Sequence, residues 1–267
     1  MLKEHMCVRN VNEYIEFLSL SLKSSFAQDF NHMHFSNELL LFLKGSTKYM
    51  IDGQEYHLQP YDMLIVPKGT YHYMVSNNTI PHVLNIINFF DDLLPEDVLE
   101  KLVKPPHIFN IKNDPFVTQF LDALRFMYNA YSEKDFERSC EGLIRELLTY
   151  CCYMPKILVP SSNQNPIIDK ILEYISSNIE EPLDAERISK ALNLSPSHIQ
   201  NTFSQYMKIG LKQYITQKKI IEAQSALLSG MSASDVAAKY HFNDYSTFYR
   251  VYKKSFGTSP SAYKKRI

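Results

Sequence analysis

KIIEAQSALLSG (residues 219–230) and SDVAAKYHFNDYSTFYRVYKKSFGTSPSAYKK (residues 234–265) carry the most specific pattern in this chain. The second segment predicts a short helix, a tight turn at Tyr240 and His241, and a further helix with aromatic residues at helical spacing. Ser234 is the expected cap of the short helix, because a serine side chain accepts a hydrogen bond from the free N–H groups at a helix start. The expected buried residues of this unit are Val236, Ala237, Phe248, Tyr252 and Phe256.

The same arrangement of two short helices occurs earlier in the chain, from Asp184 onward. Asp184 is the expected cap of a helix that ends at Asn193. Ser195 followed by Pro196 is a favoured start for the next helix, since proline suits the first helical position. The residues expected to pack together are Ile188, Ala191, Leu194, Ile199 and Phe203. Residues 167–267 therefore predict an all-α domain with two helix-turn-helix units.

These two units closely resemble the signature of the AraC/XylS family of bacterial transcription regulators. Many positions match the signature at once: Lys219, Ile220, Ala223, Leu227, Val236, Ala237, Phe242, Phe248, Gly257 and Pro260. The resemblance implies binding to double-stranded promoter DNA, with the second helix of each unit in a major groove and the grooves about 34 Å apart. His241 departs from the family pattern, which has Gly, Ala, Asn or Gln at this turn. The turn requires a left-handed backbone, which histidine tolerates at a modest cost in stability.

Matching positions assign DNA contacts to the second helix of each unit. The residues expected to face base edges are Ser197, Gln200, Asn201, Tyr245, Ser246, Thr247, Tyr249 and Arg250. Glutamine and asparagine can bind adenine through two hydrogen bonds, arginine can bind guanine, and the threonine methyl group can contact thymine. Phosphate contacts, which position a protein without reading the sequence, are expected from His198, Lys253 and Lys254.

The region from Glu38 to Phe90 has a strand-like pattern. Its apolar segments are ELLLFLK, TKYMI, EYHL, DMLIVP, YHYMVS and HVLNIINFF, each about the length of a strand. Asp52 and Gly53 predict a hairpin turn of type I′, which needs a positive φ at both central positions. Short strands separated by such turns are typical of an antiparallel sandwich or barrel. The predicted fold class is therefore α+β, with an N-terminal antiparallel β-barrel, a helical hairpin and a C-terminal all-α domain.

Three histidines and a glutamate in the N-terminal part resemble the two cupin motifs. His32, His34 and Glu38 precede Gly45 with the spacing H-x-H-x3-E-x6-G, and His72 follows in P-x-G-x2-H. The resemblance implies a cupin-like barrel and agrees with the strand pattern. It also assigns these three histidines and the glutamate to a ligand pocket.

Two or three histidines with a carboxylate are a credible ligand set for Fe, Mn, Ni or Zn. In a straight strand, His34 and Glu38 would lie about 13 Å apart, so a shared metal requires a bend, which Ser36 and Asn37 can supply. Tyr61 stands where cupins favour glycine. Sensor domains of the resembling regulators often keep such histidines as hydrogen-bonding groups without metal. The sequence therefore predicts a ligand pocket with no metal and no cofactor.

The apolar pattern changes to a helical period after residue 112. Two amphipathic helices are expected there, and they either cover an open face of the β domain or form a dimer interface. The following segment combines prolines with serine, asparagine and glutamine, as linkers do. The predicted organisation is a cupin-like sensor domain over 1–112, a dimerisation hairpin over 113–155, a linker over 156–166 and a DNA-binding domain over 167–267.

Charge and composition restrict the class of protein. Residues 1–165 contain 14 basic and 20 acidic residues, whereas residues 166–267 contain 14 basic and 9 acidic ones; a basic domain beside an acidic one is typical of a DNA-binding half joined to another kind of domain. The sequence has no apolar run of about 20 residues and no secretory signal, so a cytoplasmic protein without a membrane span is expected. Reduced thiols are expected at the four cysteines, which are Cys7, Cys140, Cys151 and Cys152.

The resulting interpretation is a transcription activator controlled by a small molecule in the cupin-like domain. Sugars are the commonest effectors of the resembling regulators. The expected partners are promoter DNA, the effector, a second copy of the chain in a homodimer, and RNA polymerase if the protein activates. Neither a phosphate-binding glycine-rich loop nor a nucleophile elbow is found, so no catalytic residue is assigned. The alternatives are a cupin metalloenzyme, a dioxygenase or isomerase, and a ligand-free regulator controlled by its abundance.

Overall fold

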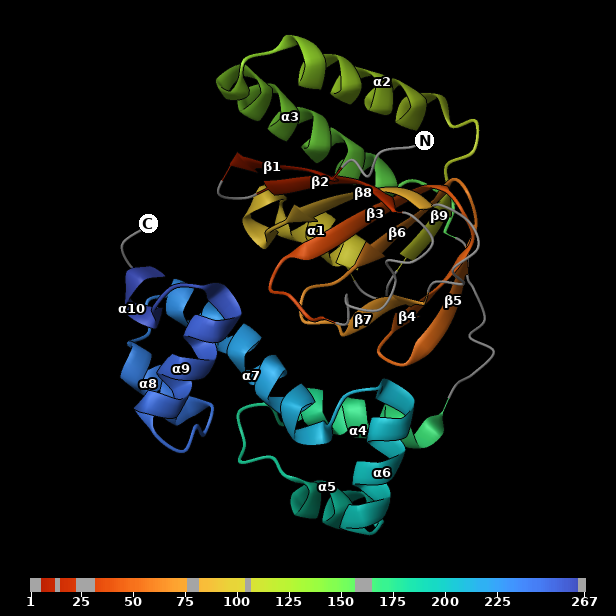
Figure 1. Cartoon of the computed structure of the whole chain (residues 1–267). Coiled ribbons are helices and arrows are strands. Elements are labelled where there is room, and N and C mark those ends of the chain that lie inside the picture. Colours follow the sequence, from red (N-terminus) through yellow and green to blue (C-terminus); the bar gives the residue numbers. More distant parts are fainter. Residues whose placement is uncertain are drawn as a thin grey trace. The chain divides into compact units, whose positions relative to one another are not determined.

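The chain divides into two compact units, Met1–Ser162 and Asn163–Ile267. The computed structural model describes residues 6–12, 15–22, 32–75, 82–103, 107–156 and 165–263. Antiparallel sheets and three α-helices form the described part of the first unit, and helices form that of the second (Figure 1). The predicted α+β fold class is confirmed. Most of the predicted linker, residues 157–164, lies outside the described residues.

Two antiparallel sheets form the β part of the first unit. The larger sheet has the strand order β1 (Met6–Asn12), β2 (Ile15–Leu22), β8 (His82–Phe89), β3 (Asn37–Lys44), β6 (Asp62–Val66) and β9 (His107–Asn110). The smaller sheet has the order β5 (Gln54–Leu58), β4 (Thr47–Ile51) and β7 (His72–Val75). All six strands predicted from the sequence are present, whereas β1, β2 and β9 were not predicted.

Left-handed backbone at two turns explains two features of the sequence. Asp52 and Gly53 join β4 to β5 with φ values of 46° and 80°, as the type I′ turn requires. Tyr61, between β5 and β6, has a φ of 72°, and this is the position where cupins favour glycine. Its backbone is held by hydrogen bonds from Tyr61 N to Phe42 O and from Ile111 N to Tyr61 O, both 2.7 Å.

Strand β3 separates two apolar cores because its side chains alternate between its two faces. Leu40 and Phe42 belong to the core between the two sheets. Leu39 and Leu41 belong to the core that the helical hairpin closes. The hairpin consists of α2 (Pro115–Ala130) and α3 (Glu133–Cys151), while η1 (Asp91–Leu93) and α1 (Glu96–Val103) precede β9.

The hairpin covers the large sheet, as one of the two interpretations expected. Its buried residues include Phe120 and Leu124 of α2 and Phe136 and Leu147 of α3, which share a core with residues of β3, β6 and β8. The aromatic side chains of Phe126, Tyr131 and Tyr153 remain exposed. Three cysteines, Cys140, Cys151 and Cys152, are free thiols as predicted, and the side chain of Cys7 lies outside the described residues.

The second unit is helical throughout its described part. Its helices are α4 (Pro166–Ser177), α5 (Ala185–Leu192), α6 (Pro196–Met207), α7 (Leu211–Leu228), α8 (Ala233–Lys239), α9 (Tyr245–Phe256) and α10 (Pro260–Tyr263). Helix α7 connects the α5–α6 pair to the α8–α9 pair (Figure 1). No helix among the described residues is long and apolar enough to span a membrane.

Most of the predicted details of the two helical pairs are confirmed. The side chains of Asp184 and Ser195 cap α5 and α6 as expected. The cap predicted at Ser234 is wrong: Ser232 caps α8, and its Oγ accepts a hydrogen bond of 3.1 Å from the N–H of Asp235. The helix begins two residues earlier because Ser232 and Asp235 have the spacing of a helix start. The prediction that Ala191 packs in the core is wrong, because this residue is exposed. Ser189 of α5 is buried instead.

Candidate functional site

Helix α6 has one buried face and one polar exposed face. Ile199 and Phe203 are fully buried, so the helix is fixed to the rest of the unit from that side. The residues predicted to contact DNA from this helix are all exposed: Ser197, His198, Gln200 and Asn201. Such a division of faces leaves the polar side chains of α6 available to a partner.

Helix α9 repeats this arrangement. Its apolar face is anchored by Phe248 and Tyr252, which are fully buried. Its N-terminus is capped by Asp244, whose carboxylate accepts from both the N–H and the Oγ–H of Thr247. Those two hydrogen bonds hold the pKa of Asp244 below its ordinary value. The predicted contact residues of α9 are exposed or half-buried: Tyr245, Ser246, Thr247, Tyr249, Arg250, Lys253 and Lys254.

A groove in the second unit brings part of these two faces together. Its volume is about 830 Å³. Gln200 and Asn201 of α6 line it together with Thr247 of α9. The other predicted contact residues do not line it: Ser197, His198, Tyr245, Ser246, Tyr249, Arg250, Lys253 and Lys254.

The groove also contains polar residues that the sequence did not assign to DNA contact. Among them are Ser204 of α6, Thr216 of α7 and Asn243 in the turn before α9. None of these three residues belongs to the positions that match the family signature. Only the fold indicates that they lie beside the residues predicted to read bases.

A buried lysine fixes the two helical pairs to one another. The Nζ of Lys219, on α7, donates hydrogen bonds of 2.8 Å to the carbonyl oxygens of Glu181 and Tyr240. Burial lowers the pKa of Lys219, opposed by attraction from Glu181. Because Glu181 precedes α5 and Tyr240 follows α8, one side chain connects both pairs through α7.

The turns within the two pairs have left-handed backbone. Asn193 ends α5 with a φ of 53°, and His241 follows α8 with a φ of 51°. The prediction of a left-handed residue at His241 is confirmed. Most side chains are strained in this region, whereas glycine and asparagine, two of the residues in the family pattern at this turn, adopt it readily.

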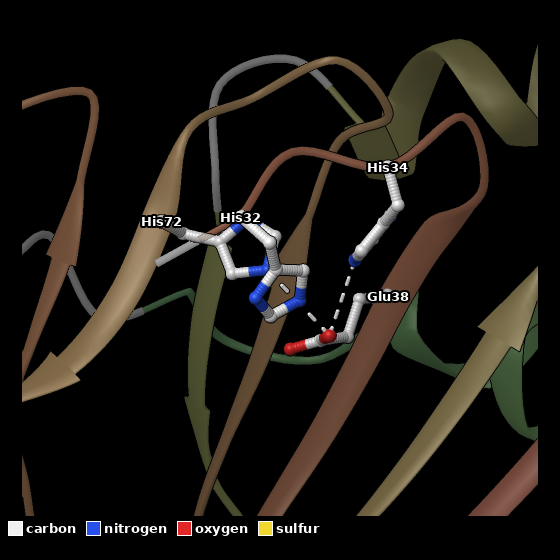
Figure 2. Close-up of side chains that lie close together, drawn as sticks. All are labelled: His32, His34, Glu38 and His72. Atoms are coloured by element: carbon white, nitrogen blue, oxygen red, sulfur yellow. Dashed lines mark hydrogen bonds and ion pairs between the residues drawn. The ribbon is translucent and has the colours of Figure 1, made fainter. Parts of the chain in front are cut away.

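The four residues predicted for the ligand pocket form one cluster in the first unit (Figure 2). Their possible ligand atoms all lie within 4.8 Å of one another. The chain bends at Phe35 and Ser36, before β3 begins, and this bend brings His34 Nε2 to 3.3 Å from Glu38 Oε2. The sequence required a bend for a shared site and placed it at Ser36 and Asn37, whereas the structure has it one residue earlier because Asn37 already belongs to β3.

Backbone contacts orient two of these imidazole rings. The Nδ1 of His34 lies 2.7 Å from the carbonyl oxygen of Ser36, and the Nδ1 of His72 lies 2.8 Å from that of Thr70. A carbonyl oxygen only accepts, so each Nδ1 carries a proton. In a neutral ring the Nε2 atom then presents a lone pair. Both Nε2 atoms are directed at Glu38 (Figure 2).

Glu38 is the buried anion at the centre of the cluster. Burial opposes its ionisation, but the neighbouring imidazoles of His34 and His72 stabilise the carboxylate and hold the pKa of Glu38 well below its ordinary value. Conversely, burial lowers the pKa of His72, but Glu38, the Thr70 carbonyl group and Asp52 together raise it above its ordinary value. The hydroxyl of Tyr49 donates to Oε1 of Glu38 at 2.9 Å, so Oε2 is the oxygen turned toward the histidines.

The donor set fits a divalent transition metal. The Nε2 of His72 is buried and has no hydrogen-bond partner among the described residues, and it lies 3.6 Å from Glu38 Oε2. Two ligands bound at about 2.0–2.1 Å in tetrahedral geometry are separated by roughly 3.4 Å, which is close to the two distances that Glu38 makes. His32, His34, Glu38 and His72 would hold the ion, and the ion would supply a positive charge between the lone pairs.

Comparisons with known proteins assign each of the two units to a known domain family. A family model described as AraC-like ligand binding domain matches residues 25–148, and one described as helix-turn-helix domain matches residues 188–266. The HTH-type transcriptional activator AarP of Providencia stuartii is 30% identical over 102 residues, which are 38% of this chain and 76% of AarP. The multiple antibiotic resistance protein MarA of Salmonella typhimurium is 33% identical over 98 residues, which are 36% of this chain and 77% of MarA.

Other matches cover a smaller share of the relative or are more distant. The putative HTH-type transcriptional regulator YkgA of Escherichia coli is 34% identical over 101 residues, which are 38% of this chain and 42% of YkgA. This chain thus spans less than half of the length of YkgA. Among solved structures, ToxT from Vibrio cholerae is 13% identical, with a TM-score of 0.41 and coverage of 95% of this chain and 98% of ToxT.

Proposed function

Since the chain belongs to the AraC family of transcriptional regulators, we propose that it binds promoter DNA sequence-specifically and that a ligand in its N-terminal unit controls its affinity. The single observation that carries the DNA-binding part is the pair of helices α6 and α9. Each is anchored by a fully buried aromatic residue, Phe203 or Phe248, and each has a polar exposed face. Both faces border the same groove.

Different residues of the two helices are expected to read bases and to bind phosphates. Gln200 and Asn201 supply amide groups that can bind adenine, and Arg250 supplies a planar guanidinium that can bind guanine. Lys253 and Lys254, in the last turn of α9, are exposed cations and suit phosphates. Phosphate contacts provide most of the affinity, and base contacts provide the preference for one site.

The remaining partners follow from the same proposal. A second copy of the chain is expected to pair through the α2–α3 hairpin, which exposes Phe126, with 62% of its surface accessible, and Tyr131 beside it. As an activator in the cytoplasm, the protein would contact RNA polymerase at the promoter. The relatives YkgA and AarP are transcriptional regulators, and we assign no catalytic residue to the chain.

The test begins with selection of bound sequences from a random pool of duplex DNA, using the full-length protein. The selected site should be bound at least about 1000-fold more tightly than random duplex at physiological salt. The double variant Gln200→Ala with Asn201→Ala should lose the preference for the selected site. The control variant Glu173→Ala, an exposed residue of α4, should keep it. Failure to enrich any sequence would refute the proposed function.

A further inference from the structure

We propose that the ligand controlling this regulator is a divalent transition metal ion held by His32, His34, Glu38 and His72. The inference rests on the proposed function and names the ligand class of its N-terminal unit. It departs from the sequence-based expectation of a pocket without metal, because the bend before β3 brings the four possible ligand atoms within 4.8 Å of one another.

A shared proton explains the cluster less well than a metal ion does. The distance of 3.6 Å between His72 Nε2 and Glu38 Oε2 exceeds the 2.7–3.2 Å of ordinary N–H···O hydrogen bonds, and the 3.3 Å to His34 Nε2 is also long. A buried nitrogen without a partner has a cost of about 1–3 kcal/mol. A cation coordinated by both nitrogens and the carboxylate would remove that cost.

The surroundings favour an ion over a sugar. The core between the two sheets is filled by buried apolar side chains, among them Leu40, Phe42 and Leu64. Sugars need several hydrogen-bonding groups spread over a cavity of their own size, whereas the described groups converge on a space a few ångströms wide. The donors are nitrogen and oxygen without thiolate, which suits Zn²⁺, Fe²⁺, Mn²⁺ or Ni²⁺.

An ion at this position would join three separate parts of the first unit. His34 lies before the bend, Glu38 is the second residue of β3 in the larger sheet, and His72 begins β7 in the smaller one. His32 lies ahead of the bend and pairs with the backbone of His72 through hydrogen bonds of 3.1 and 3.2 Å. Binding would therefore fix the edge of one sheet to the other.

Strand β3 connects this cluster to the helical hairpin. Glu38 faces the cluster, while the next residue, Leu39, lies in the core with Phe120 of α2 and Leu147 of α3. A small displacement of β3 on binding would thus act directly on the packing of the hairpin, which we expect to pair two copies of the chain. Packed cores respond to such displacements by switching between arrangements rather than by deforming gradually.

The first experiment measures metal binding by the full-length protein. After treatment with a chelator, the protein is titrated with Co²⁺ and with Zn²⁺, and bound metal is counted by elemental analysis. We expect one ion per chain and visible Co²⁺ absorption bands. His34→Ala should abolish both, and His32→Ala should weaken Zn²⁺ binding at least tenfold. His57→Ala, at an exposed histidine paired with Glu55 outside the cluster, should change neither.

The second experiment measures DNA affinity with and without one equivalent of Zn²⁺. We expect the metal to change the dissociation constant for the selected site at least tenfold in the wild type and in His57→Ala. His34→Ala should stay at the value of the metal-free wild type, which also shows that this variant is folded. If His34→Ala fails to bind DNA, His32→Ala replaces it in the comparison.

The outcomes separate this inference from the proposed function. Absence of metal from the wild type overturns the inference. So does an amount of metal in His34→Ala and His32→Ala that equals the amount in the wild type. Stoichiometric metal with unchanged DNA affinity also overturns it, because the ion would then not be the controlling ligand. In both cases specific DNA binding would persist, so the proposed function would stand. Loss of specific DNA binding under every condition would instead refute the proposed function.

Discussion

The Nζ of Lys219 lies 2.8 Å from the carbonyl oxygen of Tyr240, and this contact joins the long helix α7 to the turn of the second helical pair. The same ammonium group reaches the carbonyl oxygen of Glu181 beside the first pair. Two backbone acceptors thus share one buried donor. The separation of α6 and α9, on which simultaneous entry into two major grooves depends, is fixed partly by this side chain.

Lys219→Met should lower the free energy of unfolding of the second unit by about 2–4 kcal/mol, because it leaves two carbonyl oxygens without their donor. The measurement is urea denaturation of the full-length protein followed by circular dichroism. Lys170→Met, at an exposed lysine of α4, removes the same charge and should change the free energy by less than about 0.5 kcal/mol. Equal effects of the two substitutions would rule out this role for Lys219.

The sequence predicted the second unit well because local rules determine much of it. Helix caps at Asp184 and Ser195 and the left-handed residue at His241 follow from side-chain chemistry within a few positions. The error at Ser234 arose because Ser232 offers the same chemistry two residues earlier. Ala191 was misplaced because an alanine fits either face of a helix, so its residue type carries little information about burial.

His241→Gly should stabilise the second unit by about 0.5–1 kcal/mol. A left-handed backbone costs an ordinary residue about 1–2 kcal/mol, and glycine avoids this strain while losing some conformational entropy on folding. His241→Val should destabilise the unit by about 1 kcal/mol or more, because β-branched side chains are the most strained in this region. Thermal unfolding of both variants tests the order, and a glycine variant less stable than the wild type would contradict the expectation.

Two features of the first unit, strand β1 and the geometry of the histidine cluster, could not be predicted from the sequence. The strands from β3 to β8 alternate clearly or are continuously apolar, but β1 has the polar sequence MCVRNVN, and its place in the sheet depends on pairing with β2. The histidine cluster depends on long-range geometry as well. The motif predicted that His32, His34, Glu38 and His72 form one site. The distances between their ligand atoms depend on the bend at Ser36 and on the pairing of His32 with His72.

Arg250→Ala should weaken binding to the selected site by about 1–3 kcal/mol and relax the preference at one base pair, if the guanidinium binds a guanine through two hydrogen bonds. Arg250→Lys keeps the charge but lacks the planar fork, so it should lose the same preference while retaining more affinity. Competition assays with duplexes changed at single positions measure both quantities. A loss that is equal on selected and random DNA would reassign Arg250 to a phosphate.

The dependence of affinity on salt tests whether both helical pairs engage the duplex. Each phosphate neutralised releases counterions, so log affinity should fall with log salt at a slope of about −0.9 per phosphate, or roughly −4 to −7 for one DNA-binding unit. A single engaged pair should give about half of that slope.

The double variant Lys253→Ala with Lys254→Ala should reduce the slope by about one to two and leave sequence preference nearly unchanged, because phosphates carry no base identity. The control, Lys170→Ala with Lys190→Ala, removes two exposed lysines of α4 and α5 and the same charge, and should preserve the slope. A wild-type slope near zero would show that phosphate contacts contribute little and would contradict the assignment of α6 and α9 to two major grooves.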